Sequence, residues 1–168
     1  NTSVTSDDDI SITANTTIED DASDAVADIL GDALTLSAQT GIGTGSSLDT
    51  DVVTITAATT VTGGIAINLL DANASGVTVT LADASTSGDI TFTATADAGT
   101  KTFTSVDTNA GNISITATLG NIVLVTIASD TAVGVGANDI TVTATAGSVQ
   151  INTSVTSDDD ISITANTT

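Results

Sequence analysis

The chain contains no His, Cys, Arg, Pro, Met, Trp or Tyr, one lysine, Lys101, and two aromatic residues, Phe92 and Phe103. Without His or Cys it has no Ser–His or Cys–His nucleophile pair, no disulfide, and no imidazole or thiolate metal ligand. Without Arg it has no guanidinium to bind a phosphate group in bidentate fashion. With no Met, the sequence shows no natural start, so any signal segment is expected outside it. These absences predict a structural, non-catalytic chain.

Basic residues are almost missing, and the formal net charge is −20 over 168 residues. Nucleic-acid binding depends on basic groups that displace counterions from phosphates, so a nucleic-acid partner is excluded. The longest apolar stretch, Ile122–Ala128, is far shorter than the ~20 residues that cross a bilayer, so no membrane insertion is expected. Hydrophobic residues nevertheless make up 40% of the chain, which predicts a folded protein rather than a disordered acidic one.

An internal repeat joins the two ends of the sequence. Residues 1–17 read NTSVTSDDDISITANTT, and residues 152–168 read the same. We interpret residues 1–151 as one repeat unit and residues 152–168 as the start of the next identical unit in a tandem array. The alternative is a single subunit whose duplicated ends serve end-to-end exchange.

Short runs in which aliphatic residues alternate with Thr or Ser recur along the chain, and each is bounded by Gly, Asn or Asp. Alternation with a period of two predicts strands with one buried face. The clearest runs are residues 9–14, 53–57, 77–81, 89–94, 112–117 and 139–144, and weaker ones are 64–69, 100–106, 122–127 and 149–155. Their spacing suits either a β-solenoid or a β-sandwich. The scarcity of aromatic residues favours the solenoid, in which stacked Ile, Val, Leu and Ala fill a thin interior.

Residues 18–34 do not follow the strand pattern. Ile18, Ala22, Val26, Ile29 and Ala33 have helical spacing, with aspartates between them. Gly31 and the repeated Asp oppose a helix, because both have poor helix propensity. The sequence leaves a loop and a short amphipathic helix as alternatives here.

Several runs resemble repeats of large secreted bacterial exoproteins of the filamentous-haemagglutinin type. They are Leu34–Thr50, Val53–Thr59, Gly63–Ile67, Gly88–Ala94 and Gly111–Ala117. The resemblance implies an all-β, right-handed parallel β-helix (β-solenoid), export from the cell, and an adhesive or matrix role. It supplies no catalytic residues.

Acidic clusters are the candidate metal sites. Carboxylate oxygens suit Ca²⁺, whereas the lack of His and Cys disfavours zinc and copper. The first candidates are Asp7, Asp8 and Asp9 with their copies Asp158, Asp159 and Asp160, followed by Glu19, Asp20 and Asp21, and by Asp49 and Asp51. Plain solvated turns are the competing interpretation. No cofactor is required, and Ca²⁺ is the one candidate ion.

Three further expectations concern side chains on the predicted coils. Outward Thr-x-Thr pairs would form a hydroxyl ladder that resembles the ice-binding faces of β-solenoid antifreeze proteins. Phe92 and Phe103 would fill the core. Lys101 would be a surface group paired with a nearby Asp.

Together these observations predict a tandem 151-residue solenoid repeat of a secreted extracellular or cell-surface filament or giant adhesin, for matrix, sheath or attachment. Its partners would be adjacent repeats, lateral fibre contacts, and a cell surface or glycan. The alternatives are a calcium-dependent adhesin stalk of β-sandwich domains and an ice-binding β-solenoid.

Overall fold

The fold is all-β in the computed structural model, which describes residues 3–21, 24, 26–70, 75–96, 98–129 and 138–166. Alternating aliphatic and hydroxyl residues place successive side chains on opposite sides of an extended chain, so one side of each strand is buried. The strands are β1 (Val4–Thr5), β2 (Ile10–Ala14), β3 (Thr17–Ile18), β4 (Ile29–Ala38), β5 (Gly41–Ile42), β6 (Leu48–Thr59), β7 (Ile65–Leu69), β8 (Thr78–Ala84), β9 (Ile90–Ala94), β10 (Lys101–Thr108), β11 (Ile113–Ala117), β12 (Ile122–Ser129), β13 (Ile140–Ala144), β14 (Val149–Ser157) and β15 (Ile161–Ala165).

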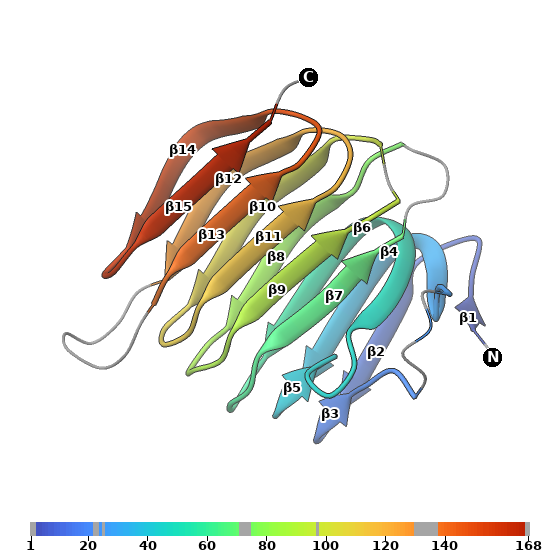
Figure 1. The fold of residues 1–168 in the computed structure, drawn as a ribbon. Coiled ribbons are helices and arrows are strands. Elements are labelled where there is room, and N and C mark those ends of the chain that lie inside the picture. Colours follow the sequence, from blue (N-terminus) through green and yellow to red (C-terminus); the bar gives the residue numbers. More distant parts are fainter. Residues whose placement is uncertain are drawn as a thin grey trace.

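All strand pairs recorded among the described residues are parallel. The chain winds into a β-solenoid of about six turns, with two long rows of strands that run along its axis (Figure 1). The first row runs from β2 and β4 through β6, β8, β10 and β12 to β14, and the second from β3 and β5 through β7, β9, β11 and β13 to β15. The predicted solenoid is confirmed, and the sandwich alternative is wrong because its sheets would be antiparallel.

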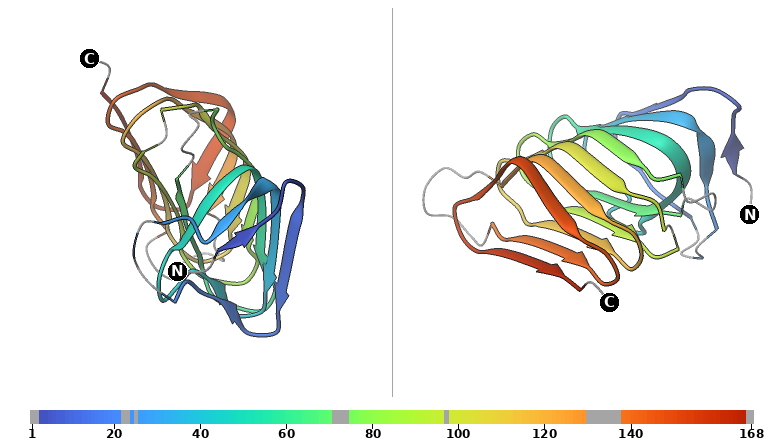
Figure 2. Two further views of the ribbon diagram at one scale, coloured as in Figure 1. Left: turned by 90° about the vertical axis from the view of Figure 1, so that its right-hand side faces the viewer. Right: turned by 90° about the horizontal axis from the view of Figure 1, so that it is seen from above.

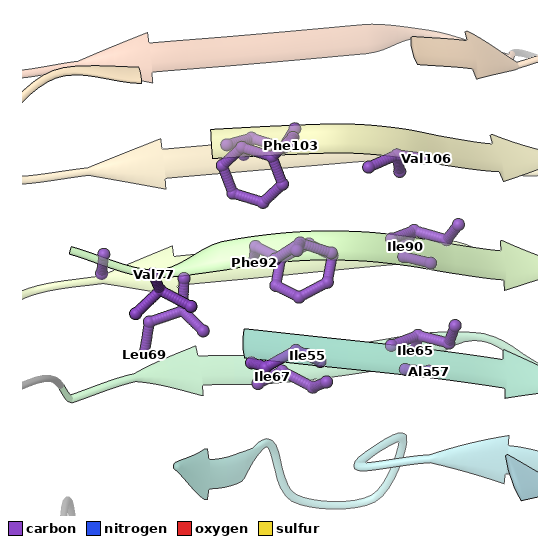
Figure 3. Packing of buried hydrophobic residues seen from close by; sticks show 14 of the residues in the cluster. Ile55, Ala57, Ile65, Ile67, Leu69, Val77, Ile90, Phe92, Phe103 and Val106 are labelled. Carbon is purple, nitrogen blue, oxygen red and sulfur yellow. The ribbon is translucent and has the colours of Figure 1, made fainter. Parts of the chain in front are cut away.

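The core lies between the two rows and consists of in-register columns of aliphatic side chains. In the second row Ile65, Ile90, Ile113 and Ile140 stack on one another and are fully buried. Phe92 and Phe103 come from opposite rows and meet edge to face, with ring centroids 5.2 Å apart (Figure 3). Both rings are about 1% exposed, so the prediction that they fill the core is confirmed.

Buried hydroxyls and glycines close the corner that follows the first row. Thr59 Oγ1 donates to the Gly63 carbonyl at 2.8 Å, and Thr108 Oγ1 donates to the Gly88 carbonyl at 2.9 Å. Gly63 has φ of +88°, and a Cβ there would lie 1.9 Å from the Thr40 carbonyl oxygen. Only glycine therefore lets consecutive turns stack this closely.

Coil length varies, and the loops absorb the variation. Residues that pair on successive coils are separated by different lengths of chain. The separation is 24 residues for Ile10 and Leu34, 21 for Leu34 and Ile55, and 27 for Ile122 and Val149. The helical alternative for residues 18–34 is wrong for the part described, which contains no helix, and residues 29–34 belong to strand β4 rather than to a loop. The described residues contain no helix that could span a membrane.

The two copies of the 17-residue segment occupy different places in the cross-section. In the first copy β2 pairs with β4 and so belongs to the first row. In the second copy the same residues form β15, which pairs with β13 in the second row. The two copies lie at opposite ends of the solenoid (Figure 2). One sequence therefore fits either row, because both rows require the same alternation of buried and outward side chains.

The prediction that Lys101 lies on the surface is wrong. The side chain is 1% exposed rather than on the surface. Its Nζ donates 2.8 Å hydrogen bonds to the carbonyls of Gly99 and Leu119, which lie in turns of successive coils. The only basic side chain of the protein thus ties two stacked turns together from the inside.

We predict that Lys101→Ala lowers the free energy of unfolding by about 3 kcal/mol, because two backbone carbonyls lose a charged donor and each such bond contributes about 1.5–3 kcal/mol. Urea unfolding followed by circular dichroism measures the change. Thr102→Ala, at the next position of the same strand, serves as the control and should have little effect. Equal stability of Lys101→Ala and the control would contradict the role given to the ammonium group.

Candidate functional site

The predicted aspartate triplets lie in exposed turns at the two ends of the solenoid. Residues 7–9 connect β1 to β2, and residues 158–160 connect β14 to β15. Asp159 and Asp160 approach Asp139, with one carboxylate oxygen of each within 4.8 Å of the others. Asp158 is not part of that group, and among the described residues Asp7, Asp8 and Asp9 join no comparable cluster. The structure therefore brings together two of the six predicted metal ligands.

Asp139 belongs to a ladder of side chains that precede the strands of the second row. The backbone N–H of Asn112 donates to Asp89 Oδ1 at 2.8 Å, that of Asp139 to Asn112 Oδ1 at 2.9 Å, and that of Asp160 to Asp139 Oδ1 at 3.3 Å. Each carboxylate or amide thus caps the next coil. The Asp139 carboxylate therefore has a structural role, which agrees with the solvated-turn interpretation.

A second cluster, which we call the Asp20 cluster, comprises Asp20, Asp28 and Asp49 near the N-terminal end. One oxygen of each carboxylate lies within 4.8 Å of the others, and Asp49 is only 4% exposed. Asp20 follows β3, Asp28 precedes β4, and Asp49 lies in β6. The pairing of β4 with β6, through Ile29 and Thr50, is what brings Asp28 beside Asp49.

Sequence reasoning found this cluster only in part. The sequence suggested one candidate metal site at residues 19–21 and another at Asp49 and Asp51. Glu19, Asp21 and Asp51 are not in the Asp20 cluster. Asp28 was missed, because its place depends on a strand register that the ambiguous segment did not reveal. Glu19 instead orders a loop, since its carboxylate accepts hydrogen bonds from Thr44 Oγ1 and the Gly45 N–H, both at 2.9 Å.

Burial and neighbouring carboxylates make Asp28 and Asp49 costly to ionise. Burial raises the pKa of the Asp28 carboxyl, and the neighbouring Asp20 charge raises it further. Burial also raises the pKa of Asp49, although a 2.8 Å hydrogen bond from Asn68 Nδ2 opposes this shift. Oδ2 of Asp28 is buried and has no hydrogen-bond partner among the described residues. A hard cation such as Ca²⁺ would relieve all three effects, because it prefers carboxylate oxygens.

A shallow hollow of about 260 Å³ lies beside this cluster and is lined by both acidic and apolar side chains. The lining residues are Val4, Ile12, Ile18, Glu19, Asp20, Asp21, Asp28, Ile29 and Leu48. The aliphatic members come from the first coils, where Ile18, Ile29 and Leu48 are buried and Val4 is exposed. A group bound here would meet carboxylates on one side and hydrocarbon on the other.

Outward hydroxyls form two in-register columns on the second row, whereas in the first row a register shift pairs Thr56 with Leu81. Each strand from β9 to β15 in that row contributes a pair: Thr91 and Thr93, Ser114 and Thr116, Thr141 and Thr143, and Ser162 and Thr164. The strands are all five residues long, so the array is regular although the loops between the strands are not. These columns continue to the last coil.

We predict that Asp49→Asn stabilises the protein at pH 7 and raises Tm by about 2–4 °C, the shift that ~1 kcal/mol produces in a domain of this size. A raised folded-state pKa means that stability falls as pH rises from the ordinary value of 3.8 through the raised value. The advantage of Asn should therefore shrink as the pH is lowered toward 3.8. Added Ca²⁺ should raise Tm of the unmodified chain more than that of the variant.

Scanning calorimetry against pH, with and without Ca²⁺, measures these effects. The matched control is Asp83→Asn, which removes a strand carboxylate outside the cluster. An equal rise in Tm on adding Ca²⁺ in all three proteins would mean that the ion acts only by general charge screening. A pH-independent advantage of Asp49→Asn would contradict the raised pKa.

Comparisons with known proteins give no match from which a function could be inferred. No protein-family model matches the chain, and neither the curated proteins nor the solved structures include a match. The resemblance to filamentous-haemagglutinin repeats therefore remains a prediction.

Proposed function

We propose that the chain is a non-catalytic structural repeat of a secreted extracellular filament or giant adhesin, built as a right-handed parallel β-helix in tandem 151-residue units. The observation that carries the proposal is the continuous stacking of parallel coils in one register, with Ile65, Ile90, Ile113 and Ile140 in a single buried column. Repeat solenoids bury a continuous core by stacking each unit on its neighbours.

Tandem repetition accounts for the duplicated segment. Residues 152–168 carry the sequence that opens the unit, NTSVTSDDDISITANTT, which supports a further unit after residue 151. Right-handed winding is the expected hand, because connections between parallel strands of one sheet are right-handed in about 98% of cases. Stacked coils with continuous backbone hydrogen bonds make a stiff rod, which suits a mechanical role.

Charge makes such a rod responsive to cations. The chain carries −20, and residues 152–168 contribute three Asp and no Lys, so one 151-residue unit carries −17. Rods of this charge repel one another at low ionic strength, where the Debye length reaches ~30 Å at 0.01 M. The Asp20 cluster and the outward aspartates are where divalent ions would reduce the repulsion and permit lateral bundling.

Cryo-electron microscopy of native assembled material, with and without a calcium chelator, tests this function. We expect continuous filaments with coils stacked at about 4.8 Å, in which backbone density passes from residue 151 into the following coils. Chelation should separate bundles without shortening single filaments. Discrete particles with free ends would contradict the proposal.

The regular hydroxyl columns favour ice binding as a second candidate function. Flat, evenly spaced Thr pairs on a rigid sheet can order water in a repeating pattern, and here the pairs stay in register over β9, β11, β13 and β15. The strands of this face are short and equal in length, so the length of chain in this face varies less from coil to coil than the length of the loops. This candidate needs only one face and is compatible with a filament.

Thermal hysteresis of the purified chain tests ice binding. The double change Thr116→Leu and Thr143→Leu interrupts one column in the middle, and we predict that it removes most of any activity. Thr126→Leu, an exposed position on β12 in the other row, is the control and should leave activity unchanged. The absence of hysteresis in the unmodified chain, or equal activity in both variants, would reject this candidate.

A further inference from the structure

We propose that the outward side of the second row, which we call the hydroxyl face, packs against the hydroxyl face of a second copy of this chain, with the two solenoids running in the same direction. The inference deepens the proposed function, because it names the surface that makes the lateral fibre contacts, and it rests on that function for its biological use. It follows from the distribution of charge over the two rows.

The hydroxyl face consists of three columns of uncharged side chains. Two columns are the hydroxyl pairs of β9, β11, β13 and β15. The third lies one residue past the strands, at Thr95, Thr118 and Thr145, which are exposed. Backbone bonds keep it in register, since the Thr118 N–H donates to the Ala94 carbonyl at 2.8 Å. In Figure 1 no described segment crosses the front of β9, β11 and β13, so the face is open to a partner.

Charge distinguishes the two rows. Strands β7, β9, β11, β13 and β15 contain no acidic or basic residue. In the first row, Asp83 of β8 pairs with Asp107 of β10, and both point outward because their neighbours in the strand are buried. Paired carboxylates repel the same face of another acidic chain, whereas the buried centre of an interface is depleted in charge. With a net charge of −20, like molecules can therefore approach through the hydroxyl face more easily than through the first row.

The size of the hydroxyl face indicates a weak contact for one unit. Five strands spaced by about 4.8 Å, with six residues of about 3.3 Å each, cover roughly 500 Å², or about 1,000 Å² for the two partners. Stable interfaces bury about 1,200–2,000 Å². Single chains should therefore associate weakly, whereas arrays of several units would pair more tightly because their contacts act together.

The column that precedes the strands determines the direction of the partner. It contains the caps Asp89 and Asp139, so one edge of the hydroxyl face is acidic. The opposite edge, at Thr95, Thr118 and Thr145, is uncharged. A two-fold axis parallel to the solenoid axis lays each acidic edge on the partner's uncharged edge, whereas antiparallel packing lays the two acidic edges on each other. Repulsion between like charges opposes the antiparallel arrangement.

Sedimentation equilibrium of the purified chain at physiological salt, up to millimolar concentration, tests the contact. A chelator is present throughout, so that divalent ions cannot link two molecules. We expect a weak equilibrium between monomer and dimer. A chain that stays monomeric at millimolar concentration would overturn the proposal.

Thr116→Asp tests the face, because it places a charge in the middle column. We expect the dimer Kd to rise about tenfold, since a two-fold contact then buries two like charges. The matched control is Thr126→Asp on the exposed side of β12 in the first row, which adds the same charge to the molecule and should have little effect. Equal weakening by both variants would mean that net charge alone opposes association, and would overturn the proposal.

Thr145→Lys tests the direction, because it places an ammonium group at the uncharged edge. In the parallel arrangement this group lies against Asp139 of the second copy, and the contact gains two exposed ion pairs. We expect the Kd to fall about fivefold more than in Thr126→Lys, which changes the net charge equally. Equal effects of the two variants would overturn the proposed arrangement.

Tm of each variant, measured first by circular dichroism, shows whether the substitution leaves the fold intact. Residue 145 lies outside the strands, so Thr145→Lys provides a test even if Thr116→Asp destabilises β11.

The contact and the proposed function can fail separately. Continuous native filaments, together with an unmodified chain that forms no dimer, would reject the contact and leave the filament standing. A dimer that responds to the variants as expected, together with discrete native particles, would support the contact and reject the filament. Thermal hysteresis in a chain that stays monomeric would assign the hydroxyl face to ice and overturn the contact.

Discussion

Parallel backbone pairing between like residues on successive coils is the constraint on which the rest of this structure depends. Once Ile90 lies over Ile65 and Ile113 lies over Ile90, each new coil buries the same kind of side chain as the one before. Small aliphatic residues then suffice for a core, and the single aromatic contact between Phe92 and Phe103 is an exception rather than the organising feature. The same stacking superimposes turns on turns, which creates both the glycine corners and the acidic clusters.

The fold was largely predictable because the decisive signal is local. Alternation such as ISITA at residues 113–117 determines a strand and its buried face without knowledge of any partner. Residues 18–34 were ambiguous for the opposite reason: aspartates and Gly31 weaken every local preference, and only pairing with β6 makes residues 29–38 extended. Lys101 was misplaced because a lone lysine predicts exposure, whereas two carbonyls of stacked turns make burial favourable.

The candidate site was predictable only in its chemistry. An acidic chain without His or Cys can offer cations nothing but oxygen, so Ca²⁺ was the natural candidate. Which carboxylates meet depends on coil length, and coil lengths vary. Asp28 and Asp49 lie 21 residues apart in sequence and are adjacent because Ile29 pairs with Thr50, a register that cannot be inferred from composition. The consecutive triplet at residues 7–9, by contrast, points its members into solvent.

The placement of one sequence in both rows shows that a solenoid of irregular coils constrains its strands only weakly. A strict helical repeat would need 151 residues to return to the same face, yet here Ile10 and its copy Ile161 lie in different rows. Each row asks only for buried and outward side chains in alternation, and the repeated segment meets that condition in either row. The irregular loops between the strands therefore do not prevent one sequence from pairing in both places.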